Sequence, residues 1–136
     1  PVMQLLIYPG LDFVSDTPSM HEFADAWPLT AETLDFFVKQ YLPENVDPSD
    51  PRISPGRQQD LRGLAPALIY GAGFDMLLDQ GAAYGERLKE AGVKVSYTRF
   101  DSLPHGFVAF PSAAPVAEAA IKQIARETAA ALKGNR

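Results

Sequence analysis

The sequence predicts an α/β protein built on three parallel strands. Three short apolar runs, each followed by a turn or a polar loop, have the pattern of strands that are buried on both faces. A helical pattern fills the interval between the second and third runs, so these elements form a β-α-β unit with parallel strands. The length of 136 residues, with 46% hydrophobic and 21% charged residues, fits one globular domain.

The strands are predicted in order along the chain. The first is Met3–Tyr8, a nearly continuous apolar run that Pro9-Gly10 closes. The second is Ala67–Tyr70, which the triplet Gly71-Ala72-Gly73 ends. The third is Val93–Phe100, which leads into a polar loop.

Two helices are predicted in the second half of the chain. The crossover helix is Asp79–Ala91, with Tyr84 and Leu88 on its apolar face and Gly92 as its stop signal. The terminal helix begins at Pro115, ends before Gly134 and covers the sheet. Its apolar face contains Ile121, Ile124, Thr128 and Leu132.

Residues 11–63 form an irregular excursion between the first two strands, with many of the prolines around one good helical pattern. In that pattern Thr30 is the predicted N-cap and Glu32 lies in the first turn. The apolar positions on one face are Leu34, Phe37, Val38, Tyr41 and Leu42. The excursion is longer than a crossover needs, and long excursions in compact domains are usually functional. Residues 64–136 then form a β-α-β-α unit.

Charge and composition argue against several function classes. The formal net charge of −5 disfavours nucleic acid and acidic lipid as partners, because these polyanions need a basic face. The absence of cysteine excludes disulfides, thiolate zinc sites, iron–sulfur clusters and a cysteine nucleophile. No apolar run reaches the roughly 18 residues of a membrane span, and no leader pattern opens the chain. We therefore expect a cytoplasmic protein that binds neither nucleic acid nor a membrane.

Polar residues follow each predicted strand: Asp12 after the first, Asp75 after the second and His105 after the third. The carboxyl ends of parallel strands share one edge of the sheet, which is where open α/β sheets bind ligands. A carboxylate on one imidazole nitrogen fixes the tautomer while the other nitrogen moves a proton. Asp75 and His105 are therefore predicted to lie within hydrogen-bond reach, as the acid and base of a hydrolytic triad.

Structural roles are the alternatives for these residues. Asp75 could cap the helix that follows it, and Asp79 is expected to have a capping role. A lone loop histidine is more often structural, but a proline and a glycine bracket His105 in a shaped loop. His21 lies in the excursion without such a context.

Apolar residues at helical spacing are more often core than ligand pocket, so the pocket candidates are weaker than the dyad. These candidates are Trp27, Leu29, Phe36, Phe37 and Phe107. The triplet Gly71-Ala72-Gly73 is too short for a dinucleotide fingerprint, so no cofactor is predicted. No metal site is predicted either.

A nucleophile is missing from the triad. The elbow that presents a catalytic serine reads Gly-x-Ser-x-Gly between a strand and a helix, and no such pentapeptide occurs in the sequence. The lipase-type oxyanion signature rich in His and Gly is absent as well. Two of the four catalytic elements are therefore not found.

Short motifs with a common order and spacing run along nearly the whole chain. They include Gln4-Leu5-Leu6-Ile7-Tyr8-Pro9, Asp50-Pro51-Arg52-Ile53-Ser54-Pro55, Gly73-Phe74-Asp75, Asp79-Gln80-Gly81 and His105-Gly106-Phe107. Together they resemble the carboxyl-terminal half of the hormone-sensitive-lipase-like family of α/β-hydrolase carboxylesterases. One departure is Asp75-Met76-Leu77-Leu78-Asp79-Gln80-Gly81, where the family commonly shows Asp-Pro-Leu-Arg-Asp-Glu-Gly.

The resemblance implies a fold, an activity and two catalytic residues. It implies that residues 1–136 are the carboxyl-terminal part of one α/β-hydrolase domain, with part of a cap in residues 11–63. It also implies a short-chain carboxylic ester hydrolase of the EC 3.1.1 type that uses a Ser-His-Asp mechanism without a cofactor. Asp75 would be the acid and His105 the base, and a fragment without the serine is expected to be inactive.

The runner-up function is a non-catalytic α/β module that uses the same edge of the sheet for binding or assembly. Met3–Tyr8 is apolar enough for an interior strand, yet nothing in the chain precedes it to pair with its outer edge. We therefore expect, besides a small ester substrate, a partner at this edge. That partner is either the amino-terminal half of the same enzyme or a second copy of the chain.

Overall fold

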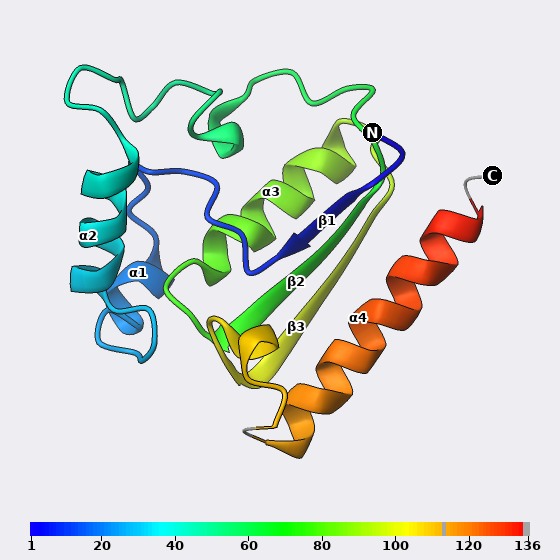
Figure 1. Ribbon diagram of the computed structural model, residues 1–136. Helices are drawn as coiled ribbons and strands as arrows, with labels where there is room; N and C mark the ends of the chain where they lie inside the picture. Colours follow the sequence, from blue (N-terminus) through cyan, green and yellow to red (C-terminus); the bar gives the residue numbers. More distant parts are fainter. Residues whose placement is uncertain (113, 135–136) are drawn as a thin grey trace.

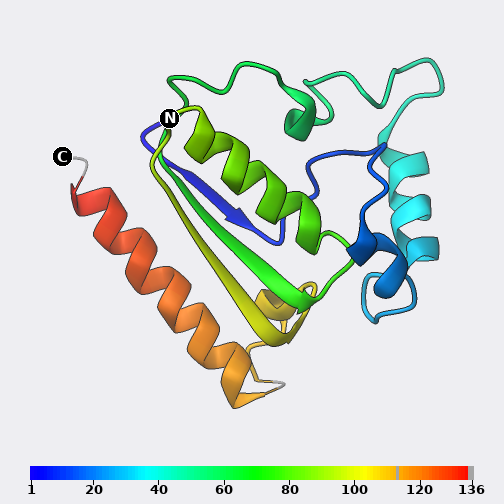
Figure 2. The same ribbon diagram turned by 180° about the vertical axis from the view of Figure 1, so that it is seen from behind.

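The computed structural model describes residues 1–112 and 114–134, and it contains a three-stranded parallel sheet with helices on both faces (Figures 1 and 2). The strands β1 (Gln4–Ile7), β2 (Ala67–Phe74) and β3 (Val95–Pro104) lie in the order β1-β2-β3. Helix α3 (Leu78–Glu90) covers one face and α4 (Pro115–Gly134) covers the other. The predicted α/β class with three parallel strands, a crossover helix and a terminal helix is confirmed.

β2 lies between the other two strands, and its side chains alternate between the two helical layers. Ile69 packs with Leu88 in the core on the α3 side. Its neighbour Tyr70 packs with Ile124 in the core on the α4 side. Both β2 residues are at most 1% exposed, which accounts for the apolar run that identified this strand.

β2 and β3 are both longer than the sequence predicts. β2 continues through the glycine triplet to Phe74, and β3 continues to Pro104. The prediction that the triplet ends the strand was wrong because these glycines make room for a neighbouring strand. A Cβ atom on Gly73 would lie 2.2 Å from the carbonyl oxygen of Asp101 in β3. The glycines of the triplet therefore allow β2 and β3 to approach each other closely.

The two long helices match their predicted positions, with α3 shifted by one residue at each end. In α4 the buried residues Ala117, Ala120 and Ile124 all lie in the first half, whereas Leu132 is 43% exposed. The prediction that α4 covers the sheet therefore holds for its first half. Within the described residues, no helix has the length and apolar character needed to cross a membrane.

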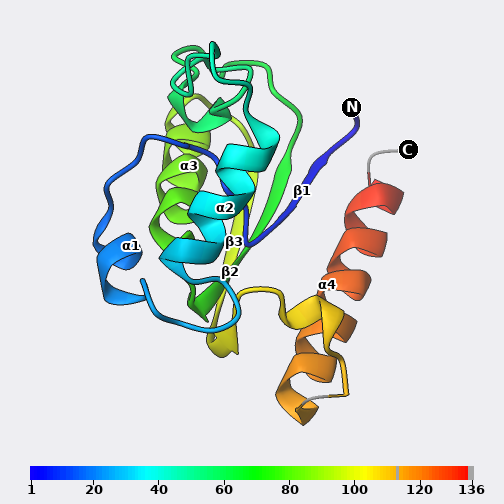
Figure 3. The same ribbon diagram turned by 60° about the vertical axis from the view of Figure 1, so that its left-hand side comes forward.

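The excursion contains α1 (Pro18–Glu22), α2 (Ala31–Tyr41) and the short 3-10 helix η1 (Pro55–Arg57). Figure 3 shows α1 and α2 on the same side of the sheet as α3, with α4 on the opposite side. Thr30 caps α2 as predicted, because its side-chain oxygen accepts the Thr33 N–H at 3.2 Å. The sequence did not predict α1, which has only five residues.

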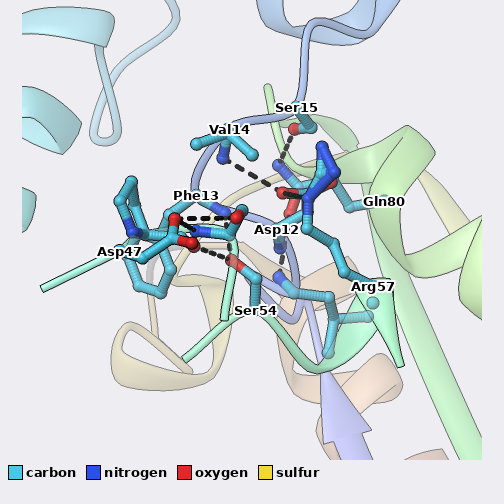
Figure 4. Close-up of polar contacts among 12 residues, drawn as sticks. Asp12, Phe13, Val14, Ser15, Asp47, Ser54, Arg57 and Gln80 are labelled. Carbon is cyan, nitrogen blue, oxygen red and sulfur yellow. Dashed lines mark hydrogen bonds and ion pairs between the residues drawn. The ribbon is translucent and has the colours of Figure 1, made fainter. Parts of the chain in front are cut away.

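Polar side chains that each make two hydrogen bonds to the backbone hold the excursion in place, and Figure 4 shows Gln80 and Ser54 among them. Gln80 of α3 accepts the backbone N–H groups of Leu11 and Asp12 at 2.8 and 3.0 Å. Ser54 is fully buried, and its hydroxyl accepts the Phe13 N–H at 2.9 Å and donates to the Pro48 carbonyl at 2.6 Å. The Arg87 guanidinium of α3 donates to the carbonyls of residues 56 and 58. Both ends of the excursion are thereby fixed relative to α3.

Candidate active site

The residues that follow β2 and β3 meet at the carboxyl edge of the sheet. His105 Nδ1 lies 2.8 Å from Oδ2 of Asp75, which is the distance of a charge-assisted hydrogen bond. β3 is paired with β2 as far as Pro104 and Phe74, so the two residues that come next are brought side by side. The hydrogen bond expected between Asp75 and His105 is present.

The Asp75 carboxylate is completely buried and uses both of its oxygens. Oδ2 faces the imidazole, and Oδ1 accepts the N–H of Leu77 at 2.9 Å. This second bond is a local turn, and the N-cap of α3 is Leu77. Asp75 is therefore not the N-cap of α3, which was the structural alternative for this residue.

Asp79 was expected to cap α3, and that expectation was wrong. It lies inside the first turn of α3, one residue after the helix begins. Its carboxylate instead accepts the N–H of Ser19 at 2.8 Å, at the start of α1. Ser19 Oγ in turn accepts the N–H of Asp79 at 3.2 Å. The pair connects the start of α1 to the start of α3, close to the acid.

His105 presents one nitrogen to the carboxylate and keeps the other free. Its side chain is 23% exposed, and no hydrogen bond to Nε2 is present in the part of the chain that the structure describes. The next residue, Gly106, has φ +76°, a left-handed conformation that favours glycine. This turn leads into the 3-10 helix η2 (Phe107–Ala109), which places Phe107 in the core.

The aromatic contact of His105 was not predicted from the sequence. The ring of Tyr8, which directly follows β1, lies against the imidazole with a centroid distance of 4.4 Å. The only sequence signal was position, since Tyr8 ends a strand at the same edge as Asp75 and His105. Asp12 and His21 are elsewhere: Asp12 forms an ion pair with Arg57 at 3.2 Å, and His21 Nε2 lies 2.5 Å from Asp16 Oδ1.

Three of the five pocket candidates lie near the dyad. Leu29 is buried with Met76 and Leu77, the residues that follow Asp75. Trp27 is 71% exposed and contacts Phe110 just after η2, with ring centroids 6.0 Å apart. The third, Phe107, is 2% exposed and belongs to the core on the α4 side.

Phe36 and Phe37 lie on α2 and are more than half exposed. Their ring centroids are 5.8 Å apart, and in the described residues the ring that packs on His105 is that of Tyr8 and neither of these two. Binding of substrate by any of the five candidates stays a prediction. No group of three or more His, Cys, Asp or Glu that could hold a metal ion is present among residues 1–112 and 114–134.

Comparison with known proteins assigns the chain to a family. A family model described as the alpha/beta hydrolase fold matches residues 1–109. The chain belongs to the hormone-sensitive-lipase-like family of α/β-hydrolase carboxylesterases. Within this family, it is 48% identical over 109 residues to the carboxylic ester hydrolase LipN of Mycobacterium tuberculosis, a match that covers 79% of this chain and 29% of LipN. The ethyl acetate hydrolase of Pseudomonas putida is 37% identical over 108 residues, which cover 79% of this chain and 34% of that protein.

Solved structures of this family share the fold. An ester hydrolase from the metagenome of Lake Arreo, solved with a bipyridine phosphonate derivative, matches with a TM-score of 0.85 at 35% identity. That match covers 96% of this chain and 41% of the other. The esterase of Pyrobaculum calidifontis matches with a TM-score of 0.84 at 35% identity, over 91% of this chain and 41% of the other. The chain thus spans well under half of the length of these carboxylesterases.

Proposed function

We propose that this chain supplies the acid and the base of a serine carboxylic ester hydrolase of the EC 3.1.1 type. One observation carries the proposal: Nδ1 of His105 is held by the buried Asp75 carboxylate, while Nε2 is left without a hydrogen bond in the described residues. A general base needs this division of its two nitrogens, because one fixes the tautomer and the other exchanges a proton.

In the proposed reaction a serine outside these 136 residues attacks the ester carbonyl. His105 Nε2 takes the serine proton, and the Asp75 carboxylate stabilises the imidazolium through Nδ1. His105 then returns the proton to the departing alcohol as the acyl–enzyme forms. In the second half, His105 takes a proton from a water molecule as the water oxygen attacks the acyl carbon. The bond to the serine oxygen then breaks, His105 returns the proton to that oxygen, and the carboxylic acid leaves.

Small carboxylic esters are the proposed substrate class. The net charge of −5 disfavours a polyanionic substrate, and the apolar Trp27 and Leu29 lie beside the loops that carry the dyad. We propose that the excursion is part of a cap that shapes the acyl pocket. The relative from Pseudomonas putida is named an ethyl acetate hydrolase, which agrees with a short acyl group.

We also propose that the nucleophile is supplied by polypeptide that pairs with β1. The outer edge of β1 carries no strand in the described residues, and Leu5 is 41% exposed there. An apolar groove of about 410 Å³ runs between this strand and α4, lined among others by Leu5, Ile7, Ile121 and Leu132. An unpaired edge beside an apolar groove is a surface that another part of a sheet protein would cover.

A chimera tests the proposal. Residues 1–109 of this chain replace the matching segment of LipN, to which they are similar, and hydrolysis of a short-chain nitrophenyl ester is measured. We expect the chimera to be active, and His105→Ala or Asp75→Asn to lower kcat by a factor of about 10⁴ to 10⁶. His21→Ala is the matched control, because this second histidine is exposed and its partner is Asp16. An active chimera that retains its kcat after His105→Ala would exclude the proposed base.

The chain alone should hydrolyse the same ester very slowly, because it offers neither a serine elbow nor an oxyanion signature. It should also remain unlabelled by a serine-reactive phosphonate. Turnover at ordinary enzyme rates that depends on His105 would mean that one of its own serines is the nucleophile. A folded chimera without any activity would favour the non-catalytic binding module.

A further inference from the structure

Tyr8 packs against the dyad, although its backbone directly follows β1. Its ring is tilted by 53° against the imidazole of His105 at a centroid distance of 4.4 Å. The same ring packs edge-to-face on Phe107, at 5.4 Å and 76°. Tyr8 thus contacts both the histidine and the buried aromatic residue that anchors the histidine loop.

The backbone of Tyr8 is unusual. Its φ is +39°, and within residues 1–112 and 114–134 no other non-glycine residue has a positive φ. This conformation is unfavourable for a residue with a Cβ atom, so something in the fold must maintain it. Strained residues of this kind concentrate at functional sites.

The positive φ of Tyr8 coincides with a break in the alternation of side chains along β1. Successive side chains of a strand alternate between the two faces, and Leu6 packs in the α3-side core while Ile7 packs in the α4-side core. Alternation would return Tyr8 to the α3 side. Tyr8 packs instead with the same core as Ile7, and this is the side on which Phe107 is buried.

The position of the Tyr8 ring is fixed from two directions. Its backbone N–H donates to the Tyr70 carbonyl at 2.6 Å, which continues the pairing of β1 with β2 by one residue. Its aromatic neighbour Phe107 packs on Phe100 of β3 at 5.5 Å, and Phe100 stacks on Tyr70 at 6.0 Å. The ring that touches the imidazole is therefore supported by all three strands.

We propose that Tyr8 is the positioning residue of His105: its ring packs against the imidazole and holds Nδ1 on the Asp75 carboxylate. The proposal rests on the proposed function only in that His105 is the base. It assigns the role to the ring and not to the hydroxyl group. Burial raises the pKa of the Tyr8 phenol, a hydrogen bond from the Val108 backbone lowers it, and the nearby Asp75 charge raises it. The phenol therefore stays neutral beside the dyad at pH 7.

Proton NMR of this chain tests the proposal directly, because only two histidines are present and His21 is an exposed internal reference. The readout is exchange of the Nδ1–H of His105 with water. We expect Tyr8→Leu to accelerate this exchange about tenfold or more, because the imidazole leaves the carboxylate more often. Tyr8→Phe keeps the ring and should leave the exchange rate within about twofold of the parent.

Tyr84→Leu is the matched control, since Tyr84 is a buried tyrosine in the α3-side core. It should lower global stability without a selective effect on the His105 proton. Unchanged exchange in Tyr8→Leu, or equal acceleration in Tyr8→Leu and Tyr84→Leu, would overturn the proposal.

In an active chimera, Tyr8→Leu should lower kcat with KM nearly unchanged, and Tyr8→Phe, which keeps the ring, should have the kcat of the parent chimera. A folded but inactive chimera contradicts the proposed function alone, because the exchange measurement on this chain still decides whether Tyr8 positions the imidazole.

Discussion

At the scale of single residues, the sequence predicts two residues of the candidate site, Asp75 and His105, but not the third, Tyr8. Asp75 and His105 were identified from sequence because each is a polar residue in the loop that follows a predicted strand, and parallel strands bring such loops to one edge of the sheet. Tyr8 could not be identified in this way. Its role depends on a backbone angle of +39°, and nothing in a Tyr-Pro-Gly sequence specifies that angle in advance.

The positive φ of Tyr8 predicts an inverted preference between alanine and glycine. Both substitutions remove the ring, so their difference reports the backbone alone. We expect Tyr8→Gly to be more stable than Tyr8→Ala by about 1 kcal/mol, because glycine adopts a positive φ without steric strain. Urea unfolding midpoints at equal slopes measure this difference.

The same pair of substitutions at Tyr84 is the control. Tyr84 lies inside helix α3, where alanine should be the more stable residue by about 1 kcal/mol. A Tyr8→Ala variant that is as stable as Tyr8→Gly would mean that the positive φ carries no strain.

At the scale of elements, the sequence predicted the strands and long helices but not where β2 and β3 end. Helix positions follow from periodicity and caps such as Thr30, which are local signals. The ends of β2 and β3 depend on a contact between segments almost thirty residues apart. Gly73 looked like part of a turn because the strand that crowds it, with Asp101 at the contact, is remote in sequence.

Two glycine-to-alanine substitutions should have opposite effects. Gly73→Ala places a Cβ atom 2.2 Å from the Asp101 carbonyl oxygen, so β2 and β3 must separate, with a loss of about 1 to 3 kcal/mol of unfolding free energy or more. Gly85→Ala, inside α3, places its Cβ atom 3.4 Å from Ile69 Cδ1 of β2, which is the short end of ordinary van der Waals contact. It should gain up to about 1 kcal/mol from helix propensity. Equal unfolding free energies of the two variants would contradict this explanation of the glycine triplet.

The outer edge of β1 should make the isolated chain self-associate. Leu5 is 41% exposed on a strand that pairs only with β2 in the described residues. We expect oligomers in sedimentation at micromolar concentration, and we expect Leu5→Lys to shift the chain toward monomer because a charge opposes edge pairing. Val14→Lys, at a residue of equal exposure in the excursion, is the control. A monomeric parent chain with slow exchange of the Leu5 amide would show that the edge is already protected.

At the scale of the whole molecule, buried and half-buried tyrosines make stability depend on pH in the alkaline range. The pKa values of Tyr8, Tyr70, Tyr84 and Tyr97 are all raised, chiefly by burial, and for Tyr70 also by its hydrogen bond to Glu127. A raised pKa in the folded state means that the phenols ionise first in the unfolded chain. Their contribution to stability is complete below the unfolded pKa of about 10 and is lost as pH rises through the folded values.

We therefore expect the free energy of unfolding to fall as pH increases above about 10, as measured by urea unfolding at a series of pH values. Tyr70→Phe should flatten this fall, since a phenylalanine cannot ionise. Tyr41 is 71% exposed, so Tyr41→Phe is the control that should leave the slope unchanged. A profile that Tyr70→Phe does not alter would assign the alkaline transition to other groups.

The anchors of the excursion have a consequence for how this part of the protein can diverge. Gln80 and Arg87 hold it through the N–H groups of residues 11 and 12 and the carbonyls of residues 56 and 58. Every amino acid carries these groups, apart from the N–H that proline lacks. Substitutions in the excursion can therefore replace the side chains beside the dyad while the attachment to α3 persists. The surface over Asp75 and His105 can therefore vary while the geometry of the pair beneath it stays the same.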